Sequence, residues 1–220
     1  ILSSKGWEVY SAKYDQLGAI ACRILVPGYS EIYPLEELIW NNTNEALIFR
    51  SDILNLHSLT DSSLSILLER LSINEVDEYS YVSTLIGVAF DENTVWGQLT
   101  VIELKLLIHL ALGQLEESRE LVGALLQYND NTVDRGLFFQ ALESVLEVRL
   151  GEELDLDDYV NNFRRMFGHN HMNAAIGSIE GSVRFFGLTV TNMNLEGLDR
   201  HQRLMNSFEK LHKARSKSVS

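Results

Sequence analysis

The hydrophobic positions divide the sequence into two regions with different periods. Residues 7–13 (WEVYSAK) and 19–26 (AIACRILV) are short runs rich in β-branched and aromatic residues, separated by YDQLG. Two such runs joined by a short loop that ends in glycine are typical of a β-hairpin. The second run is apolar at nearly every position, which predicts a strand covered on both faces. Because two strands cannot supply that cover, we expect the other strands of this sheet to lie outside the segment or in a partner.

After Pro34, apolar residues recur every three or four positions, which is the period of an α-helix. Pro34 suits the first turn of a helix, and acids follow it where the helix dipole favours them. The predicted fold class is mainly α, with a β-hairpin over 1–34 and a helical domain over 35–220. The helices are predicted over 35–42, 44–57, 62–72, 77–90, 99–112, 115–128, 133–150, 155–167, 171–186 and 197–214.

An internal repeat organises the helical region. In LKLLIHLALGQLEESRELVGALLQY, one helix ends before Gly113 and the next begins at Leu115, with the small Ser118 placed to face the first helix. This grammar resembles the helix-turn-helix unit of tetratricopeptide repeats, and similar turns recur at Gly151 and Gly187. Consecutive pairs stack because no pair can bury its apolar face alone. The pattern therefore predicts a tetratricopeptide-like array, which is more often a binding surface than a catalytic one.

Charge changes the picture of possible partners. Over 220 residues, 31 acids against 18 lysines and arginines give a net charge of −13, which disfavours nucleic acid as a direct partner. The charge is uneven, since GEELDLDD at 151–158 is acidic and residues 199–217 are basic. The basic end is explained by the helix dipole or, alternatively, by a docking patch for an acidic partner. We find no apolar run of membrane-spanning length and no signal peptide, so we expect no membrane partner and an excised segment of a longer protein.

Candidate chemistry is sparse. The single cysteine, Cys22, excludes a disulfide framework, suggests a cytoplasmic protein and is predicted to be a buried hydrophobe. His169 and His171 lack a third metal ligand at a usual spacing, and His109 is expected to be partly buried and hydrogen-bonded. Paired acids such as Glu116 and Glu117 fall in helix first turns, where the dipole explains them. The residues thus indicate no catalytic, cofactor-binding or metal site.

One stretch carries a more specific signal. YDQLGAIACRILVPGYSEIYP resembles the end of the YcaO domain, whose last strand reads roughly A-x-R-[IV]-[IV]-V-P-G, and the matching residues are Arg23, Val26, Pro27 and Gly28. The later segments ALGQLEESRELV, NNFRRMFG, GSVRFFGL and HQRLMNSFEKLHKA resemble the bacterial branch of the family, in which a helical, tetratricopeptide-like region follows the core.

The resemblance implies a role for the whole protein rather than for this segment. YcaO enzymes use Mg-ATP to activate a backbone amide oxygen, and their nucleotide ligands lie upstream of the part seen here. Azoline-forming members commonly end in Pro-x-Pro-x-Pro, whereas this chain ends KARSKSVS. The bacterial branch is instead linked to β-methylthiolation of a small-subunit ribosomal protein, as an accessory to the radical enzyme RimO.

Three hypotheses follow. The first is a non-catalytic C-terminal domain that binds no cofactor itself and contacts its own YcaO core, a second copy in a homodimer, RimO and the ribosomal protein. The second is an independent helical-repeat adaptor, for which the hairpin would be dispensable. In the third, the segment contributes to the ATP site of the core through Arg23 or the C-terminal cations.

Overall fold

The computed structural model describes residues 9–16, 19–26, 46–127, 133–151 and 153–218. The chain divides into two compact units, residues 45–199 and residues 1–44 together with 200–220. Among the described residues the secondary structure is helical apart from one hairpin and an isolated bridge. The predicted fold class, mainly α with an N-terminal hairpin, is confirmed.

The hairpin joins β1 (Tyr10–Gln16) and β2 (Ala19–Leu25) in an antiparallel two-stranded sheet, with Tyr10 opposite Leu25 and Gln16 opposite Ala19. The first strand therefore runs three residues further than predicted, because the backbone ladder continues through Tyr14–Gln16. The prediction that Cys22 is buried was wrong: Cys22 is exposed, as are Arg23 and Ile24. That prediction assumed cover on both faces, and the described sheet has no third strand.

The larger unit holds two hydrophobic cores. The first is built from α2 (Ala46–Leu54), the short 3-10 helix η2 (Leu56–Ser58), α3 (Asp61–Ile73), α4 (Val82–Ile86) and α5 (Val95–Gln98). The second is built from α7 (Leu115–Gln127), α8 (Val133–Leu150), α9 (Leu156–Phe167) and α10 (His169–Ile179). Helix α11 (Asp199–Ser218) belongs, apart from its first residue, to the smaller unit.

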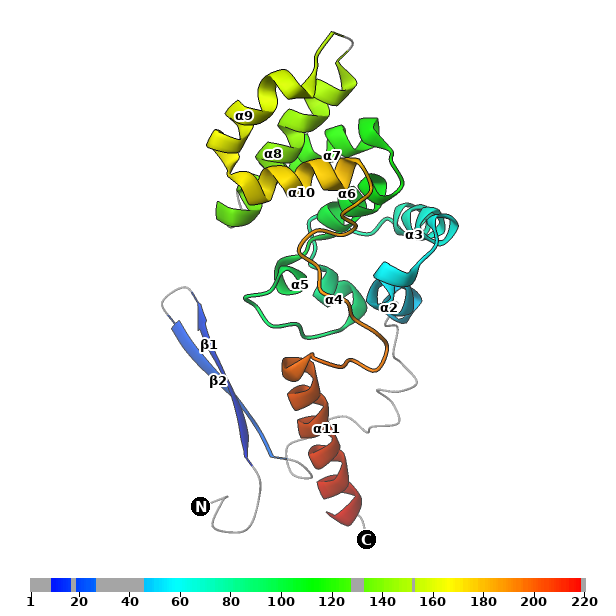
Figure 1. Cartoon of the computed structure of the whole chain (residues 1–220). Helices are drawn as coiled ribbons and strands as arrows, with labels where there is room; N and C mark the ends of the chain where they lie inside the picture. The colour runs from blue at the N-terminus through cyan, green and yellow to red at the C-terminus, as the bar shows by residue number, and fades with distance from the viewer. Residues whose placement is uncertain (1–8, 17–18, 27–45, 128–132, 152, 219–220) are drawn as a thin grey trace. The chain divides into compact units, whose positions relative to one another are not determined.

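Helix α6 (Val101–Ala111) belongs to both cores (Figure 1). Leu104 and Leu107 enter the first core, whereas Ile102 and Leu106 enter the second. Every residue from 101 to 108 is buried, including two charged ones. A helix that is apolar almost all round is the central helix of its domain, and α6 has that position here.

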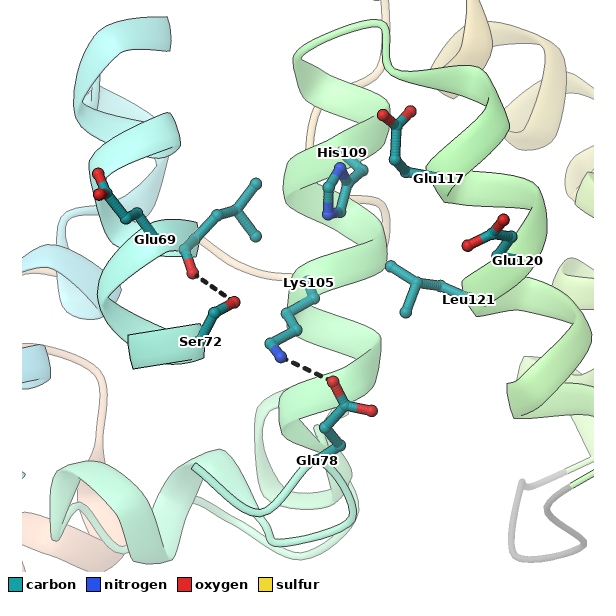
Figure 2. Close-up of a pocket in the computed structure, with 9 residues that line it drawn as sticks. Glu69, Ser72, Glu78, Lys105, His109, Glu117, Glu120 and Leu121 are labelled. Atoms are coloured by element: carbon teal, nitrogen blue, oxygen red, sulfur yellow. Dashed lines mark hydrogen bonds and ion pairs between the residues drawn. The ribbon is translucent and has the colours of Figure 1, made fainter. Parts of the chain in front are cut away.

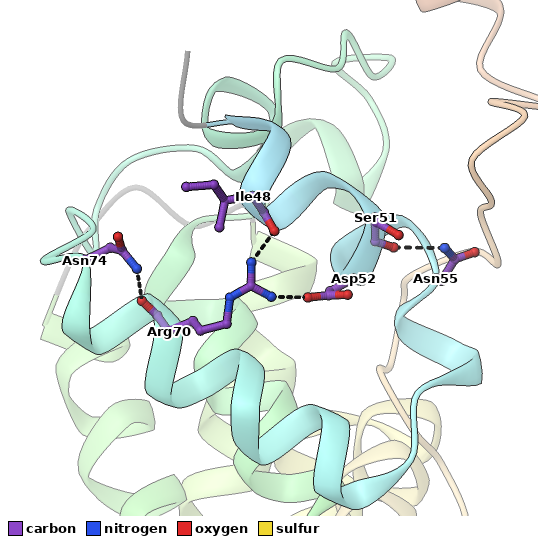
Figure 3. Close-up of polar contacts among 6 residues, drawn as sticks. All are labelled: Ile48, Ser51, Asp52, Asn55, Arg70 and Asn74. Atoms are coloured by element: carbon purple, nitrogen blue, oxygen red, sulfur yellow. Dashed lines mark hydrogen bonds and ion pairs between the residues drawn. The ribbon is translucent and has the colours of Figure 1, made fainter. Parts of the chain in front are cut away.

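Helices α2 and α3 are joined by one arginine (Figure 3). Arg70 on α3 forms an ion pair with Asp52 on α2, with 2.5 Å between Nη1 and Oδ2, and donates a second hydrogen bond to the carbonyl of Ile48. Its guanidinium also lies over the ring of Phe49, 5.4 Å from the centroid. The fork of the guanidinium thus binds a side chain and a backbone group of the same neighbouring helix.

The predicted helix over 77–90 was wrong in most of its length. Only Val82–Ile86 is helical, and Gly87 ends it in the left-handed conformation. The residues before it pair instead with the start of α6: Val82 N–H donates to Leu99 O at 2.8 Å, and Ile102 N–H donates to Glu78 O at 2.8 Å. A tertiary backbone pairing has therefore replaced the helix that the local pattern favoured.

The predicted helix over 171–186 also ends early, at Ile179. The chain from 180 to 198 has no regular secondary structure and is held to the helices by hydrogen bonds. Trp96 Nε1 donates to Thr189 O at 2.9 Å, and Thr191 Oγ1 donates to Leu54 O at 2.7 Å. The first bond satisfies a backbone carbonyl of the irregular segment, and the second satisfies a carbonyl at the C-terminal end of α2, where no partner within the helix exists.

Candidate functional site

A groove with a volume of about 300 Å³ lies between α3, the segment that follows α3, α6 and α7 (Figure 2). Four glutamates line it: Glu69 from α3, Glu78 from the following segment, and Glu117 and Glu120 from α7. The only cation of fixed charge in the lining is Lys105 of α6. The groove is therefore predominantly negative.

The lysine in the groove is already neutralised. Lys105 belongs to the central helix and only 11% of its side chain is exposed. Its Nζ lies 2.7 Å from Oε1 of Glu78, whose side chain is 44% exposed. Because the buried ammonium group is matched by this carboxylate, Lys105 offers little attraction to an anionic ligand.

His109 lines the same groove one turn further along α6. Its Nδ1 lies 2.7 Å from the amide oxygen of Gln114, which stands in the turn before α7. An amide oxygen only accepts hydrogen bonds, so Nδ1 carries the hydrogen. The expectation that His109 is partly buried and hydrogen-bonded is confirmed.

The three remaining glutamates, Glu69, Glu117 and Glu120, are exposed, and the carboxylate of Glu69 lies on the side of α3 away from α6 (Figure 2). Among the described residues none of the three takes part in a salt bridge. In the same part of the chain, no three histidine, cysteine, aspartate or glutamate side chains are arranged to hold one metal ion. Free carboxylates spread along two helices form a surface that attracts extended cations.

A second polar cluster is buried between α6 and α8. Arg135 Nε donates to Glu103 Oε1 at 2.6 Å, and its Nη1 donates to the carbonyl of Phe186 at 3.1 Å. The guanidinium lies within 4.9 to 5.6 Å of the ring centroids of Phe138, Phe139 and Phe186. Burial raises the pKa of Glu103 above 4.5, and the charge and hydrogen bond of Arg135 act against that rise.

The residues of the family signature occupy one end of the hairpin. Arg23 is exposed in β2 opposite Ala12, and Val26, directly after the strand, is buried. Pro27 and Gly28 lie outside the described residues. Within the described ranges, no ion pair or side-chain hydrogen bond of Arg23 assigns it a role.

The three predicted turn glycines have different surroundings. Gly113 adopts a φ of +70° between α6 and α7, as the helical-hairpin pattern requires, and Ser118 is buried in the next helix. Gly151 follows α8, and a Cβ there would lie 2.9 Å from Leu154 Cδ1. Gly187 has a φ of +83° but stands in the irregular segment, not between two helices. The stacked tetratricopeptide-like array stays a prediction.

Sequence reasoning missed both the groove and the buried ion pair. The signal for the second was present, because Glu103 and Lys105 interrupt an otherwise apolar run and Arg135 stands just before two phenylalanines. Charges in a helix that is apolar on all sides must be paired when buried. The groove, by contrast, is lined by residues of α3 and α7, among them Glu69, Glu117 and Glu120. Nothing in the local sequence predicts that these two helices lie near each other.

The fold is that of a mainly α-helical domain that follows an antiparallel hairpin in the sequence, with a negatively charged groove on its surface. Residues 46–217 match the family model described as "YcaO cyclodehydratase C-terminal domain". The chain therefore belongs to the YcaO family, as the strand signature and the helical segments suggested.

Two curated proteins are similar over almost the whole chain. The "Ribosomal protein S12 methylthiotransferase accessory factor YcaO" of Escherichia coli (strain K12) is 31% identical over 220 residues, covering 98% of this chain and 38% of that protein. An "Uncharacterized protein" of Haemophilus influenzae is 33% identical over 216 residues, covering 96% of this chain and 37% of that protein. The chain thus spans less than two fifths of the length of either relative. None of the helices in the described part of the chain has the length and apolar character needed to cross a bilayer.

Proposed function

We propose that this chain is the non-catalytic C-terminal part of a YcaO protein and that it acts by binding other proteins. The observation that carries the proposal is the match of residues 46–217 to the YcaO C-terminal domain, combined with a surface groove lined by four glutamates and one lysine. A helical domain with a charged groove suits recognition of a partner. The partners we propose are the chain's own YcaO core and a second copy in a homodimer.

The hairpin supports the proposed contact with the core. Its two strands form a sheet of their own in the described residues, and the side chain of Ile24 is 57% exposed. An isolated two-stranded hairpin is marginally stable in water. We infer that β1 and β2 complete the sheet of the ATP-binding core and that residues 1–34 belong to that core, with the helical domain over 35–220.

The relative from Escherichia coli suggests the process in which the whole protein acts. Its name describes an accessory factor of a ribosomal protein S12 methylthiotransferase. We therefore propose that the whole protein, in the cytoplasm, assists RimO in β-methylthiolation of a small-subunit ribosomal protein. In this proposal Mg-ATP binds to the core, and the helical domain holds and orients the partners.

Two measurements test the proposal. Titration calorimetry with Mg-ATP should show binding by the full-length protein and none by this 220-residue chain. Comparable affinity in both would contradict the non-catalytic assignment. Co-precipitation should recover RimO with the full-length protein and with this chain alone. Recovery by the full-length protein but not by this chain would overturn the role in partner binding.

A further inference from the structure

We propose that the apolar face of α11 packs against the ATP-binding core of the whole protein. The inference rests on the proposed function and deepens it, since it adds a second element, after the hairpin, to the surface that contacts the core. The apolar face of α11 is formed by Leu204, Met205, Phe208 and Leu211.

This face is open to solvent in the chain described here. Leu204, Met205 and Phe208 are 56%, 51% and 57% exposed, and Leu211 is partly buried. Positions 204, 208 and 211 are four and three residues apart, and 205 comes three residues before 208, so all four lie on one side of the helix. Large apolar side chains that are more than half exposed and share a face mark a contact surface, whereas single ones need no explanation.

The opposite face of α11 is polar. Arg203 and Lys210 are exposed, and their spacing of seven residues places both on the side of the helix away from Phe208. Further along, Lys213 Nζ lies 2.7 Å from Glu209 Oε1 in an exposed ion pair. One side of the helix is therefore suited to water, and only the apolar side is suited to packing against another element.

The described part of the smaller unit does not supply a core for α11. Among the apolar side chains described in residues 1–44 and 200–220, Val26 alone is buried. Helices in proteins gain most of their stability from packing of an apolar face, and a two-stranded hairpin is marginally stable in water. The hairpin and α11 therefore share the same need for apolar cover.

The grouping of the two elements indicates one neighbour for both. The hairpin and α11 belong to one compact unit although they lie near opposite ends of the sequence. We have assigned the hairpin to the sheet of the core. This chain spans less than two fifths of the length of either relative, so a protein of that length has ample further polypeptide to cover both elements. A single interface with the core would bury Ile24 of β2 and the apolar face of α11 together.

The test compares amide hydrogen exchange, measured by mass spectrometry, in the full-length protein and in this 220-residue chain. If the core covers α11, the amides of residues 204–211 should exchange at least about tenfold more slowly in the full-length protein. The amides of α8, which packs inside the larger unit, should exchange equally in both proteins. Equal rates for residues 204–211 in the two proteins would overturn the assignment.

Two double variants of α11 identify the face that is covered. Leu204→Gln with Phe208→Gln changes the apolar face, and Arg203→Gln with Lys210→Gln is the matched change on the polar face. In the full-length protein, the first variant should lose the slow exchange of residues 204–211 and the second should keep it. In this chain, both should change the rates by less than about twofold, because these positions are exposed there.

Circular dichroism checks that both variants fold. Equal effects of the two variants in the full-length protein would contradict the assignment of the apolar face. An effect of the first variant in this chain as large as in the full-length protein would do the same, since it would reflect the helix itself and not its cover.

Two other occupants are separated by the same measurement. Cover by the core is intramolecular, so the slow exchange should persist over an about hundredfold dilution, and its loss would assign the face to a second copy. A basic amphipathic helix can also lie on an anionic membrane. Exchange by this chain is therefore repeated with vesicles of phosphatidylglycerol and phosphatidylcholine, which should leave it unchanged. Slower exchange of residues 204–211 with vesicles would assign the face to lipid. Either result would overturn the proposal.

The outcome can be separated from that of the proposed function, because hydrogen exchange requires neither RimO nor Mg-ATP. If the amides of β1 and β2 exchange slowly in the full-length protein and those of α11 do not, the assignment of α11 fails while the contact between hairpin and core stands. If α11 is protected but RimO is not recovered, the proposed partner is wrong and the assignment of α11 stands.

Discussion

The carboxylate of Glu103 and the guanidinium of Arg135 form an ion pair that is almost completely shielded from solvent. The two side chains are 6% and 10% exposed, and they connect the central helix α6 to α8. Arg135 also binds the carbonyl of Phe186, so one side chain joins two helices and the irregular segment after α10. Removing solvent from both charges is costly, and that cost is offset only while both partners are present.

Replacing Arg135 by methionine should destabilise the larger unit by about 3–5 kcal/mol, because Glu103 then stays buried without a cation. Chemical denaturation followed by circular dichroism measures the change. The double variant Arg135→Met, Glu103→Leu should recover most of the loss, since it leaves no charge buried. A double variant that is less stable than the single one would contradict this prediction, because it would mean that the uncompensated charge of Glu103 is not the cause of the loss.

The same single variant should depend on pH in a defined direction. Burial already raises the pKa of Glu103 above 4.5, and loss of the Arg135 charge raises it further. Because the pKa of Glu103 is higher in the folded chain than in the unfolded chain, the protonated carboxyl favours the folded state. That contribution is fully present below the unfolded pKa and is lost as the pH rises through the folded pKa. The deficit of Arg135→Met relative to the unmodified chain should therefore shrink as the pH is lowered through the folded pKa toward the unfolded value.

His57 should make the stability of the folded chain fall in mild acid. Burial lowers the pKa of His57 below 6.5, Arg184 acts in the same direction, and a hydrogen bond with the backbone of Leu188 opposes both. The unfolded chain thus takes up the proton first, so stability is full above pH 6.5 and falls as the pH drops toward the folded value.

The variant His57→Gln should show a shallower loss of stability below pH 6.5 than the unmodified chain. Thermal melting across this range measures the difference. His169→Gln, at an exposed position, removes a histidine without removing a buried one and should leave the profile unchanged. Parallel profiles for His57→Gln and the unmodified chain would contradict the assignment.

Glycine is required at position 187 for two reasons. Its φ is +83°, and a Cβ would lie 3.0 Å from Val95 Cγ2 and 3.1 Å from Arg135 Nη1. Gly181 has a similar φ of +76° but open space around its Cα. Gly181→Ala should therefore cost about 1–2 kcal/mol for the backbone alone, and Gly187→Ala should cost more. Equal changes in the denaturation midpoint would mean that the close approach to Arg135 contributes nothing.

The contact between α2 and α3 should depend on Arg70. Arg70→Met keeps an apolar stem over Phe49 but removes the ion pair with Asp52 and the bond to Ile48 O. Both charged side chains are about one third exposed, so we expect a loss of only about 1 kcal/mol in urea denaturation. The control Arg149→Met breaks a more exposed pair with Glu180 and should change stability by less than about 0.5 kcal/mol. A larger effect in the control would contradict this ranking.

The sequence predicted the elements whose stability is local. Helices α3, α7, α8 and α9 begin and end within two residues of the predicted positions, because their apolar period, and for α8 and α9 the glycine that follows, are properties of the segment itself. The hairpin was predicted for the same reason. Segment 77–90 failed because its backbone pairs with residues about 17 to 24 positions away, next to and within α6, whereas the predicted helix 171–186 ends at a local turn after Ile179. Local periodicity carries no information about such partners.

The candidate site was less accessible to sequence reasoning. His109 was predicted to be partly buried, since it interrupts an apolar face, and that prediction is confirmed. The groove itself depends on how α3 packs beside α6, which places Glu69 and Glu120, about fifty residues apart in the sequence, in the lining of one groove. Such proximity follows from tertiary packing, and no spacing rule within one helix predicts it.

The position of α6 between two cores limits how this domain can vary. An outer helix that has one face toward solvent can be lengthened or trimmed. The central helix α6 has no such face. Each of the two cores takes part of its packing from α6. We therefore expect that neither half of the unit stays folded when the other half is removed. Natural variation should therefore accumulate at the outer helices and leave the shared one almost unaltered in size and polarity.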